Sequence, residues 1–328
     1  MRAIRIHEFG GPEVLKLEDI PTPQPGPDEV LVRVRGVGIN PYESYIREGR
    51  YTFLPPRPFT LGGEGAGDIV AVGENVKQWH VGDAVWGSLK GSHAEYALAD
   101  AALIYPKPDR LSYEEAGGLL TVCATAVIGL VVLGEVHDGE TVFISGAAGG
   151  VGSIGVQLAA AFGARVIAAV GSEEKAALAK DLGADTVINY TEGSLEDALR
   201  AAAPDGINVT FDGVGKPVFL QAIRNMASGG RYVLYGGSGG RDLAFEAPEF
   251  YRRNLSLIGF SAASHPRAAE ARRWMRDELV LLLASGRVRA IVAKVFPLSE
   301  TADAYRYLAS RAALGKVILD PTLDAPEG

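Results

Sequence analysis

A glycine-rich loop near the middle of the chain carries the clearest chemical signal. The apolar run Thr141–Ser145 predicts a strand, and it leads through the loop into an apolar helix that begins near Ser153. Glycines let a backbone approach a pyrophosphate, and the helix start offers free N–H groups and a positive dipole end. The loop residues are Gly146, Ala147, Ala148, Gly149, Gly150, Val151 and Gly152. They predict a dinucleotide site; a purely structural tight turn is the alternative, since Ala148 replaces the second glycine of the usual pattern.

The end of the next strand bears on which dinucleotide binds. An acidic residue there holds the ribose 2′-hydroxyl of NAD and repels the 2′-phosphate of NADP. This strand ends Ala169-Val170-Gly171-Ser172, without an acid at its tip, although two glutamates follow. The groups available to a 2′-phosphate are Ser172, Lys175 and Tyr190. NADPH is therefore the predicted cofactor, with Lys175 as a merely solvated helix residue as the alternative.

A second group of candidate residues lies in the short segment Asn40–Tyr51. Asn40 can cap a helix that starts at Pro41, with Glu43 as the return partner and Gly49 just beyond the helix end. A site without a metal must polarise a substrate oxygen with hydrogen-bond donors, and this segment supplies an amide and several phenols. Capping and packing alone are the alternative role for Asn40 and Tyr45.

The elements that must position these groups fall into two patterns. The first ~115 residues predict a β-rich, partly open barrel, with its strongest strand over Glu29–Arg35. From Glu140 onward, strands alternate with helices, which implies right-handed crossovers and a parallel sheet covered on both faces. The expected elements are Thr141–Ser145, Val151–Phe162, Arg165–Val170, Glu173–Leu182, Thr186–Asn189, Leu195–Ala202, Val209–Asp212, Pro217–Ala227 and Arg231–Tyr235.

The remaining segments are a tail, a connector and one apolar stretch. We expect the tail, with a helix over Pro266–Ser285 and a last strand over Lys316–Leu319, to fold back onto the first half. Alternate prolines over Pro21–Pro27 predict an extended connector. The uncharged stretch Ala116–Gly134 contains several glycines and threonines, so it predicts a helix buried in protein and not a membrane span.

Composition limits the class of protein. The chain has 328 residues, 47% of them hydrophobic, which is enough for about two domains. Its net charge of -8 is spread along the sequence, so nucleic acid is not an expected partner. A membrane is not an expected partner either. The single cysteine, Cys123, forms no intrachain disulfide, and the start lacks the apolar run of a signal peptide. A cytoplasmic enzyme is expected.

Several motifs, in order along nearly the whole chain, resemble a known family. They are His7–Leu15, Gly38-Ile39-Asn40-Pro41, Gly62–Gly67, Ala147–Gly152 and Leu182-Gly183-Ala184-Asp185. The sequence is similar to zinc-independent quinone oxidoreductases of the zeta-crystallin type, in the medium-chain dehydrogenase/reductase superfamily. The resemblance implies an α/β fold: a GroES-like β-rich catalytic domain plus a Rossmann domain with a doubly wound parallel sheet. We expect residues 1–118 and 261–328 to form the first, and residues 119–260 to form the second, NADPH-binding domain.

The same resemblance implies roles for single residues. It places Asn40, Tyr45 and Tyr51 beside the nicotinamide and Thr125 near its carboxamide. Gly236 and Ser238 follow the strand Arg231–Tyr235, at the sheet edge where ligands bind, and Arg311 matches a segment near the adenine phosphate. Asp212 is expected to form a turn. Pairing of the edge strand Leu255–Gly259 implies a homodimer.

Metal binding is not expected. Zinc-dependent alcohol dehydrogenases of this superfamily use a cysteine and a histidine as catalytic ligands, whereas Asn40 and Gly63 occupy those places here. The histidines at 7, 80, 93, 137 and 265 show no close ligand spacing. The predicted activity is NADPH-dependent reduction of a quinone or related conjugated carbonyl. Reduction of 2-enoyl thioesters, with Tyr51 as proton donor, and a non-catalytic nucleotide-binding role are the alternatives.

Overall fold

The computed structural model describes residues 1–324 and contains two compact units. Unit 1 combines residues 1–121 with residues from 290 onward, and unit 2 comprises residues 122–289. The sequence predicts boundaries after residues 118 and 260. The second boundary differs because residues 261–289 pack within unit 2, where helix α9 (Ala268–Trp274) contacts η2 (Val127–Leu133).

Unit 2 is built on a six-stranded sheet in which every pairing is parallel. The strand order is β11-β10-β9-β12-β13-β14, so β9 lies at the point where the order reverses. The strands are β9 (Thr141–Ser145), β10 (Arg165–Val170), β11 (Thr186–Asn189), β12 (Ile207–Asp212), β13 (Met226–Leu234) and β14 (Ser256–Gly259). Ligands of such sheets bind beyond the carboxyl ends of the strands next to that reversal.

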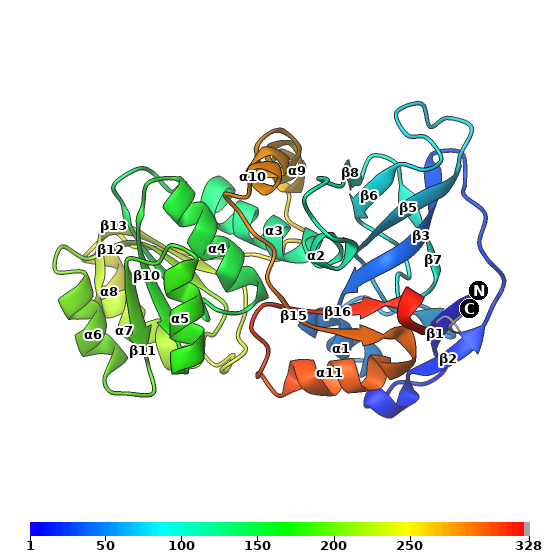
Figure 1. Cartoon of the computed structure of the whole chain (residues 1–328). Helices are drawn as coiled ribbons and strands as arrows, with labels where there is room; N and C mark the ends of the chain where they lie inside the picture. Colours follow the sequence, from blue (N-terminus) through cyan, green and yellow to red (C-terminus); the bar gives the residue numbers. More distant parts are fainter. Residues whose placement is uncertain (325–328) are drawn as a thin grey trace. The chain divides into compact units, whose positions relative to one another are not determined.

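Helices connect consecutive strands of this sheet, and Figure 1 shows α4 and α5 beside β10 and β11. They are α4 (Gly150–Ala161), α5 (Glu173–Asp181), α6 (Leu195–Ala202), α7 (Lys216–Arg224) and α8 (Ala247–Tyr251). The central strands are buried on both faces: Val142, Phe143 and Ile144 of β9 are all fully buried. This burial explains the continuous apolar runs of the sequence, and the predicted alternation of strands and helices is confirmed.

The expected helix over Pro266–Ser285 is observed as a chain of three helical segments. They are α9, η3 (Met275–Leu279) and α10 (Val280–Ser285). Just after them, the Gln157 side chain accepts a hydrogen bond from Arg289 N at 2.7 Å and donates one to Arg289 O at 3.0 Å. These bonds and the packing of α9 hold this part of the tail on unit 2.

Unit 1 consists mostly of strands, and its last strand pairs with a strand from its first half. Figure 1 shows β16 beside β15, and β16 also pairs antiparallel with β3, where Leu319 faces Val37. The strands are β1 (Arg2–Ile6), β2 (Lys16–Asp19), β3 (Glu29–Gly38), β4 (Phe59–Thr60), β5 (Gly65–Val72), β6 (Ala84–Gly87), β7 (Tyr96–Asp100), β8 (Ile104–Pro106), β15 (Val292–Pro297) and β16 (Lys316–Asp320). The expected return of the tail to the first half is confirmed for residues 290–324.

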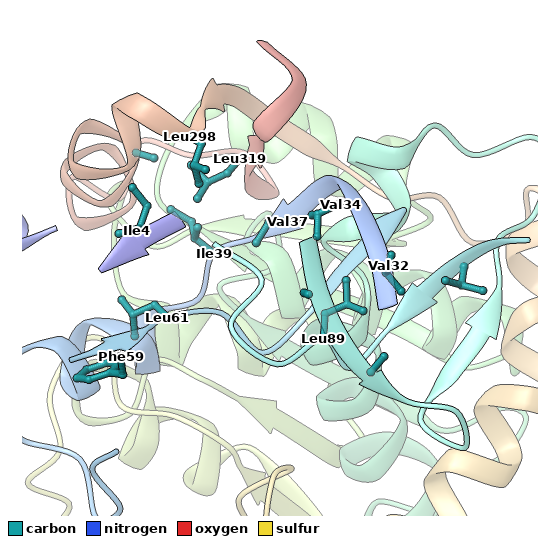
Figure 2. Packing of buried hydrophobic residues seen from close by; sticks show 14 of the residues in the cluster. Ile4, Val32, Val34, Val37, Ile39, Phe59, Leu61, Leu89, Leu298 and Leu319 are labelled. Carbon is teal, nitrogen blue, oxygen red and sulfur yellow. The ribbon is translucent and has the colours of Figure 1, made fainter. Parts of the chain in front are cut away.

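One hydrophobic cluster contains residues from all of these strands except β2 (Figure 2). Val32, Val34 and Val37 from β3 pack in the same cluster as Leu298 and Leu319 from the tail. The alternating pattern of β3 is satisfied in this way, because the residues between, Arg33 and Arg35, are exposed. The tail is therefore part of the core of unit 1.

Short helices complete the two units. Those of unit 1 are η1 (Pro12–Val14), α1 (Pro41–Arg47), α2 (Tyr113–Gly117), η4 (Leu298–Glu300), α11 (Thr301–Ala309) and η5 (Pro321–Asp324). Helix α3 (Leu120–Ala126) begins at the boundary between the units and continues into η2. Most of this apolar stretch is buried, as predicted, and none of the helices within residues 1–324 is long and apolar enough to cross a membrane.

Candidate functional site

In unit 2, the glycine-rich loop has the geometry that a pyrophosphate requires. Gly146 adopts a left-handed conformation with φ of 59°, and Gly149 caps α4 without a side-chain hydrogen bond. A Cβ at Gly152 would clash with the Gly146 carbonyl and stand 2.8 Å from Ala147 Cα. The loop therefore packs tightly on a helix whose first N–H groups lack a side-chain cap. A dinucleotide phosphate fits this arrangement.

Asp212 fixes the strand ends beside this loop. Its buried carboxylate accepts hydrogen bonds from Ser145 Oγ, from Val214 N at 2.8 Å, from Gly215 N at 3.0 Å and from Tyr232 Oη at 2.7 Å. Burial raises the pKa of Asp212, whereas these hydrogen bonds lower it. The predicted turn role of Asp212 is confirmed, and the carboxylate also ties together the ends of β9, β12 and β13.

The residues predicted to contact a 2′-phosphate gather at the end of β10. Ser172 caps α5, where its Oγ accepts a hydrogen bond from Lys175 N at 3.3 Å. The Tyr190 hydroxyl stands 2.6 Å from where a Cβ of Gly171 would lie. Tyr190 is 42% exposed. The Ser172 cap and the Tyr190 hydroxyl thus lie beside the bare backbone of Gly171, and Lys175 lies in the first turn of α5.

Other predicted cofactor contacts are more scattered. Ser238 donates hydrogen bonds from N and Oγ to Gly213 O, each at 3.1 Å, and a Cβ at Gly236 would stand 2.9 Å from the same oxygen. These two residues therefore lie at the carboxyl edge of the sheet, as predicted. Thr125 is buried on α3. Arg311 belongs to unit 1, just after α11, with φ of 60°, and its role toward an adenine phosphate stays a prediction.

In unit 1, Asn40 lies in a buried cluster of charged and polar groups. Its Oδ1 accepts a hydrogen bond from Lys316 Nζ at 2.8 Å, and its Nδ2 donates to Glu64 Oε1 at 2.8 Å. Lys316 Nζ lies 2.8 Å from the same Glu64 oxygen and also donates to Ile39 O at 3.0 Å. Thr121 N donates to the other Glu64 oxygen at 2.7 Å. Both ends of the Asn40 amide are thus held in fixed orientations.

Local capping places Asn40 at this cluster. Asn40 precedes α1 as its N-cap residue, Pro41 opens the helix, and Asn40 N donates to Glu43 Oε2 at 2.7 Å. Gly49 follows the C-cap residue with φ of 73°, as predicted. Asn40 is therefore more than a helix cap, because its side-chain amide also forms hydrogen bonds with Glu64 and Lys316.

A second buried chain of polar groups starts from Glu43. Its Oε2 accepts a hydrogen bond from Tyr305 Oη at 3.0 Å, and Tyr305 Oη lies 3.0 Å from His93 Nε2. Burial raises the pKa of Glu43 to about 7, and the charge of Glu64 adds to this effect. The Asn40 N–H, the Lys316 charge and the Tyr305 hydroxyl lower the pKa but do not outweigh burial. Burial lowers the pKa of His93 to about 3, so its ring is neutral.

The predicted phenols lie on and after α1. Tyr45 and Tyr51 are half-buried, and the Arg50 guanidinium lies 5.5 Å from the Tyr45 ring centre. The Tyr51 ring centre is 6.1 Å from that of Tyr42. The structure thus brings two phenols together beside the Asn40 cluster, one of which the sequence analysis did not select.

The sequence analysis missed the charged members of this cluster. Glu64 lies within the glycine motif Gly62–Gly67 and Lys316 starts the predicted strand Lys316–Leu319, so neither was predicted as a site residue. A usable signal existed: a charged residue directly before an apolar strand, or within a run of glycines, must be exposed or paired once buried. Tyr305 and His93 carried no such signal, because only the fold brings them together.

No group of three or more His, Cys, Asp or Glu side chains within residues 1–324 is arranged to hold a metal ion.

Comparisons with known proteins identify the family of the chain. A model of the alcohol dehydrogenase GroES-like domain matches residues 26–109, and a zinc-binding dehydrogenase model matches residues 150–277. The quinone oxidoreductase of Rattus norvegicus is 33% identical over 324 residues, which cover 97% of each chain.

The chain belongs to the quinone oxidoreductases of the medium-chain dehydrogenase/reductase superfamily. The resemblance found in the sequence is therefore confirmed, as is the pairing of a GroES-like domain with a Rossmann domain. Among solved structures, the Escherichia coli quinone oxidoreductase in complex with NADPH has a TM-score of 0.89 at 30% identity. The match covers 98% of this oxidoreductase and 100% of that chain. A mycobacterial protein solved with NADPH has the same TM-score at 33% identity, covering 98% and 100% of the two chains.

Proposed function

We propose that this oxidoreductase reduces a quinone or related conjugated carbonyl with NADPH, without a catalytic metal. The observation that carries the proposal is the state of Asn40. Its amide is bonded to both Lys316 and Glu64, at the place where zinc-dependent members have their cysteine ligand. A neutral amide held in this way serves hydrogen bonding, and thiolate or imidazole ligands for zinc are missing there.

NADPH is the cofactor that unit 2 fits. The glycine-rich loop and the start of α4 would hold its pyrophosphate, and Ser172, Lys175 and Tyr190 would contact its 2′-phosphate. The solved relatives that contain NADPH support this assignment. When bound, NADPH supplies a hydride to the acceptor. We infer from this that unit 2 is the cofactor domain and unit 1 the catalytic domain.

The phenols of unit 1 would act on the acceptor. A quinone that receives a hydride develops negative charge on an oxygen, and donors aimed at that oxygen stabilise the charge. Tyr45 and Tyr51 are half-buried and lie within and after α1, next to the Asn40 cluster. Phe53 and Leu54 follow after Thr52 and are 79% and 40% exposed. Apolar side chains next to phenols suit a flat ring that carries a carbonyl oxygen.

Reduction of 2-enoyl thioesters is the second candidate, because the same Tyr51 could give a proton to carbon. One assay distinguishes quinone or enal reduction from enoyl thioester reduction, and both from a protein without either activity. Oxidation of NADPH would be followed with a panel of quinones, enals and enoyl thioesters, each with and without a strong chelator. Turnover of quinones or enals that withstands the chelator supports the proposal; turnover of thioesters alone, or none at all, would refute it.

We also infer that the protein forms a homodimer through β14. This strand is an edge of the six-stranded sheet, and its Leu257 is 40% exposed. An unpaired edge with an exposed apolar side chain favours pairing with a second copy. Sedimentation of the purified protein tests this: a monomer at micromolar concentration, or a dimer unaffected by Leu257→Lys, would contradict the β14 interface.

A further inference from the structure

Tyr42 is a phenol that none of the roles above uses. It lies on α1 and its hydroxyl rests against the backbone of Gly63. A Cβ added to Gly63 would stand 2.7 Å from Tyr42 Oη and 4.0 Å from its Cζ; apart from its chain neighbours, no other described heavy atom lies within 4 Å. The missing side chain at Gly63 is therefore what leaves room for the Tyr42 hydroxyl.

The surroundings of Tyr42 are those of the candidate site. Its ring centre is 6.1 Å from that of Tyr51, and the next residue after Gly63 is Glu64, which binds the Asn40 amide. Within residues 1–324, the Tyr42 hydroxyl makes no hydrogen bond. The Tyr42 side chain is half-buried, and a hydroxyl that lacks a partner in the protein can form its hydrogen bond with a ligand.

The protonation state of Tyr42 suits a donor. Burial raises its pKa, and the nearby groups Glu43, Glu64 and Tyr51 raise it further. The phenol therefore keeps its proton at any working pH and can donate it in a hydrogen bond.

We propose that Tyr42 is a further catalytic residue, whose hydroxyl donates a hydrogen bond to the oxygen of the conjugated carbonyl or quinone substrate. Gly63 stays without a side chain so that the hydroxyl can take this position. The proposal rests on the proposed function and deepens it. When the substrate gains a hydride with its two electrons, the negative charge that develops on the oxygen is stabilised by the donor. Tyr42 keeps its proton, and water supplies the proton that completes the product.

A first test measures the pairing of Tyr42 with Gly63 through stability, without any substrate. Gly63→Ala should lower the Tm more in the wild-type background than in the Tyr42→Phe background, because its Cβ meets the hydroxyl and the tyrosine must shift. In the Tyr42→Phe background, the same change should leave the Tm nearly unchanged, because the nearest atom is then at 4.0 Å. An equal loss in both backgrounds would overturn the pairing.

A second test measures the donor. Tyr42→Phe should lower kcat/KM for quinones about tenfold, the worth of one hydrogen bond, and leave NADPH affinity unchanged. A nitrophenolate, whose charged oxygen resembles that of the reduced substrate, should bind about tenfold more weakly to the variant in the presence of NADP⁺. Tyr96→Phe is the matched control, because this half-buried tyrosine on β7 also makes no side-chain hydrogen bond within residues 1–324.

The outcomes separate this proposal from the proposed function. If the wild-type protein reduces no quinone or enal but loses nitrophenolate affinity in Tyr42→Phe, the donor role stands and the proposed substrate class is wrong. If quinone turnover and nitrophenolate affinity are the same in wild type and Tyr42→Phe, the donor role of Tyr42 is wrong, whatever the substrate.

Discussion

Lys316 Nζ lies 2.8 Å from Glu64 Oε1, although 252 residues separate the two in the chain. The Glu64 side chain is fully buried and that of Lys316 is 10% exposed. Charges removed from water are tolerated only when they are paired and hydrogen-bonded, as these are through Asn40, Ile39 and Thr121. Strand β16 is thus joined by an ion pair to Glu64 and by hydrogen bonds to Ile39 and Asn40.

Removal of one charge of this pair should be costly. We expect Lys316→Met to lower the free energy of unfolding by about 3–5 kcal/mol, because it leaves Glu64 buried without its cation. Urea denaturation of the purified variant measures the loss. The control is Glu64→Gln combined with Lys316→Met, which removes both charges and should lose less than Lys316→Met alone. A double variant less stable than the single variant would contradict the explanation by charge.

Glu43 should make stability depend on pH. Its pKa is raised to about 7 in the folded protein, from an ordinary value of 4.5. The folded state therefore binds the proton more tightly, and stability present below the unfolded pKa is lost as pH rises through 7. The loss is on the order of 3 kcal/mol. We expect Glu43→Gln, which stays neutral, to lose less stability than wild type between about pH 5 and about pH 8.

The pH dependence of wild-type stability must be compared with that of Glu43→Gln, because His93 changes stability with pH in the opposite direction. Its pKa is lowered from 6.5 to about 3, so its contribution is complete above 6.5 and is lost as pH falls toward 3. Thermal unfolding of both proteins across this range separates the two groups. Identical profiles for wild type and Glu43→Gln would show that Glu43 is ionised in the folded protein throughout.

Lys175 should contribute to the choice of cofactor. A charge-assisted contact to the 2′-phosphate is worth up to a few kcal/mol, and about 1.4 kcal/mol is already a tenfold change in affinity. We therefore expect NADPH to bind at least about tenfold more tightly than NADH. Lys175→Ala should narrow this ratio, measured by fluorescence titration with each cofactor. Lys180→Ala removes the same charge from the other end of α5 and should leave the ratio unchanged. Equal affinity of the wild-type protein for both cofactors would refute the roles of Ser172, Lys175 and Tyr190.

Activity should not depend on zinc. Asn40 and Gly63 stand where zinc-dependent members have their ligands, and Asn40 is engaged by Lys316 and Glu64. Elemental analysis of the purified protein should find less than stoichiometric zinc, and dialysis against a strong chelator should leave turnover unchanged. One tightly held zinc per chain, with activity lost on its removal, would be the contrary result.

Tyr51 distinguishes the two candidate activities. Water can protonate the oxygen of a reduced quinone, so Tyr51→Phe should lower quinone turnover by roughly tenfold or less and retain NADPH binding. An enoyl thioester needs a proton delivered to carbon, and the same change should then cost on the order of a hundredfold. A large loss with quinones at unchanged NADPH affinity would make Tyr51 a true acid, and a large loss of NADPH affinity would make it a cofactor contact.

Local patterns in the sequence were sufficient for the architecture of unit 2 and for one part of the site. Strand Thr141–Ser145, the glycine loop after it and the capping of α1 by Asn40, Pro41 and Glu43 all depend on residues within one or two turns of each other. Such short-range signals are legible because propensity, glycine conformation and capping act along the chain.

Only the tertiary structure decided which distant residues complete the cluster in unit 1. Lys316 reaches Glu64 because β16 pairs with β3, and Tyr305 reaches Glu43 because α11 packs against α1. The contact of Tyr42 with Gly63 likewise depends on how α1 lies over the segment before β5. Sequence spacing holds no measure of these distances, since long-range pairing is set by the packing of the whole core and not by neighbouring residues.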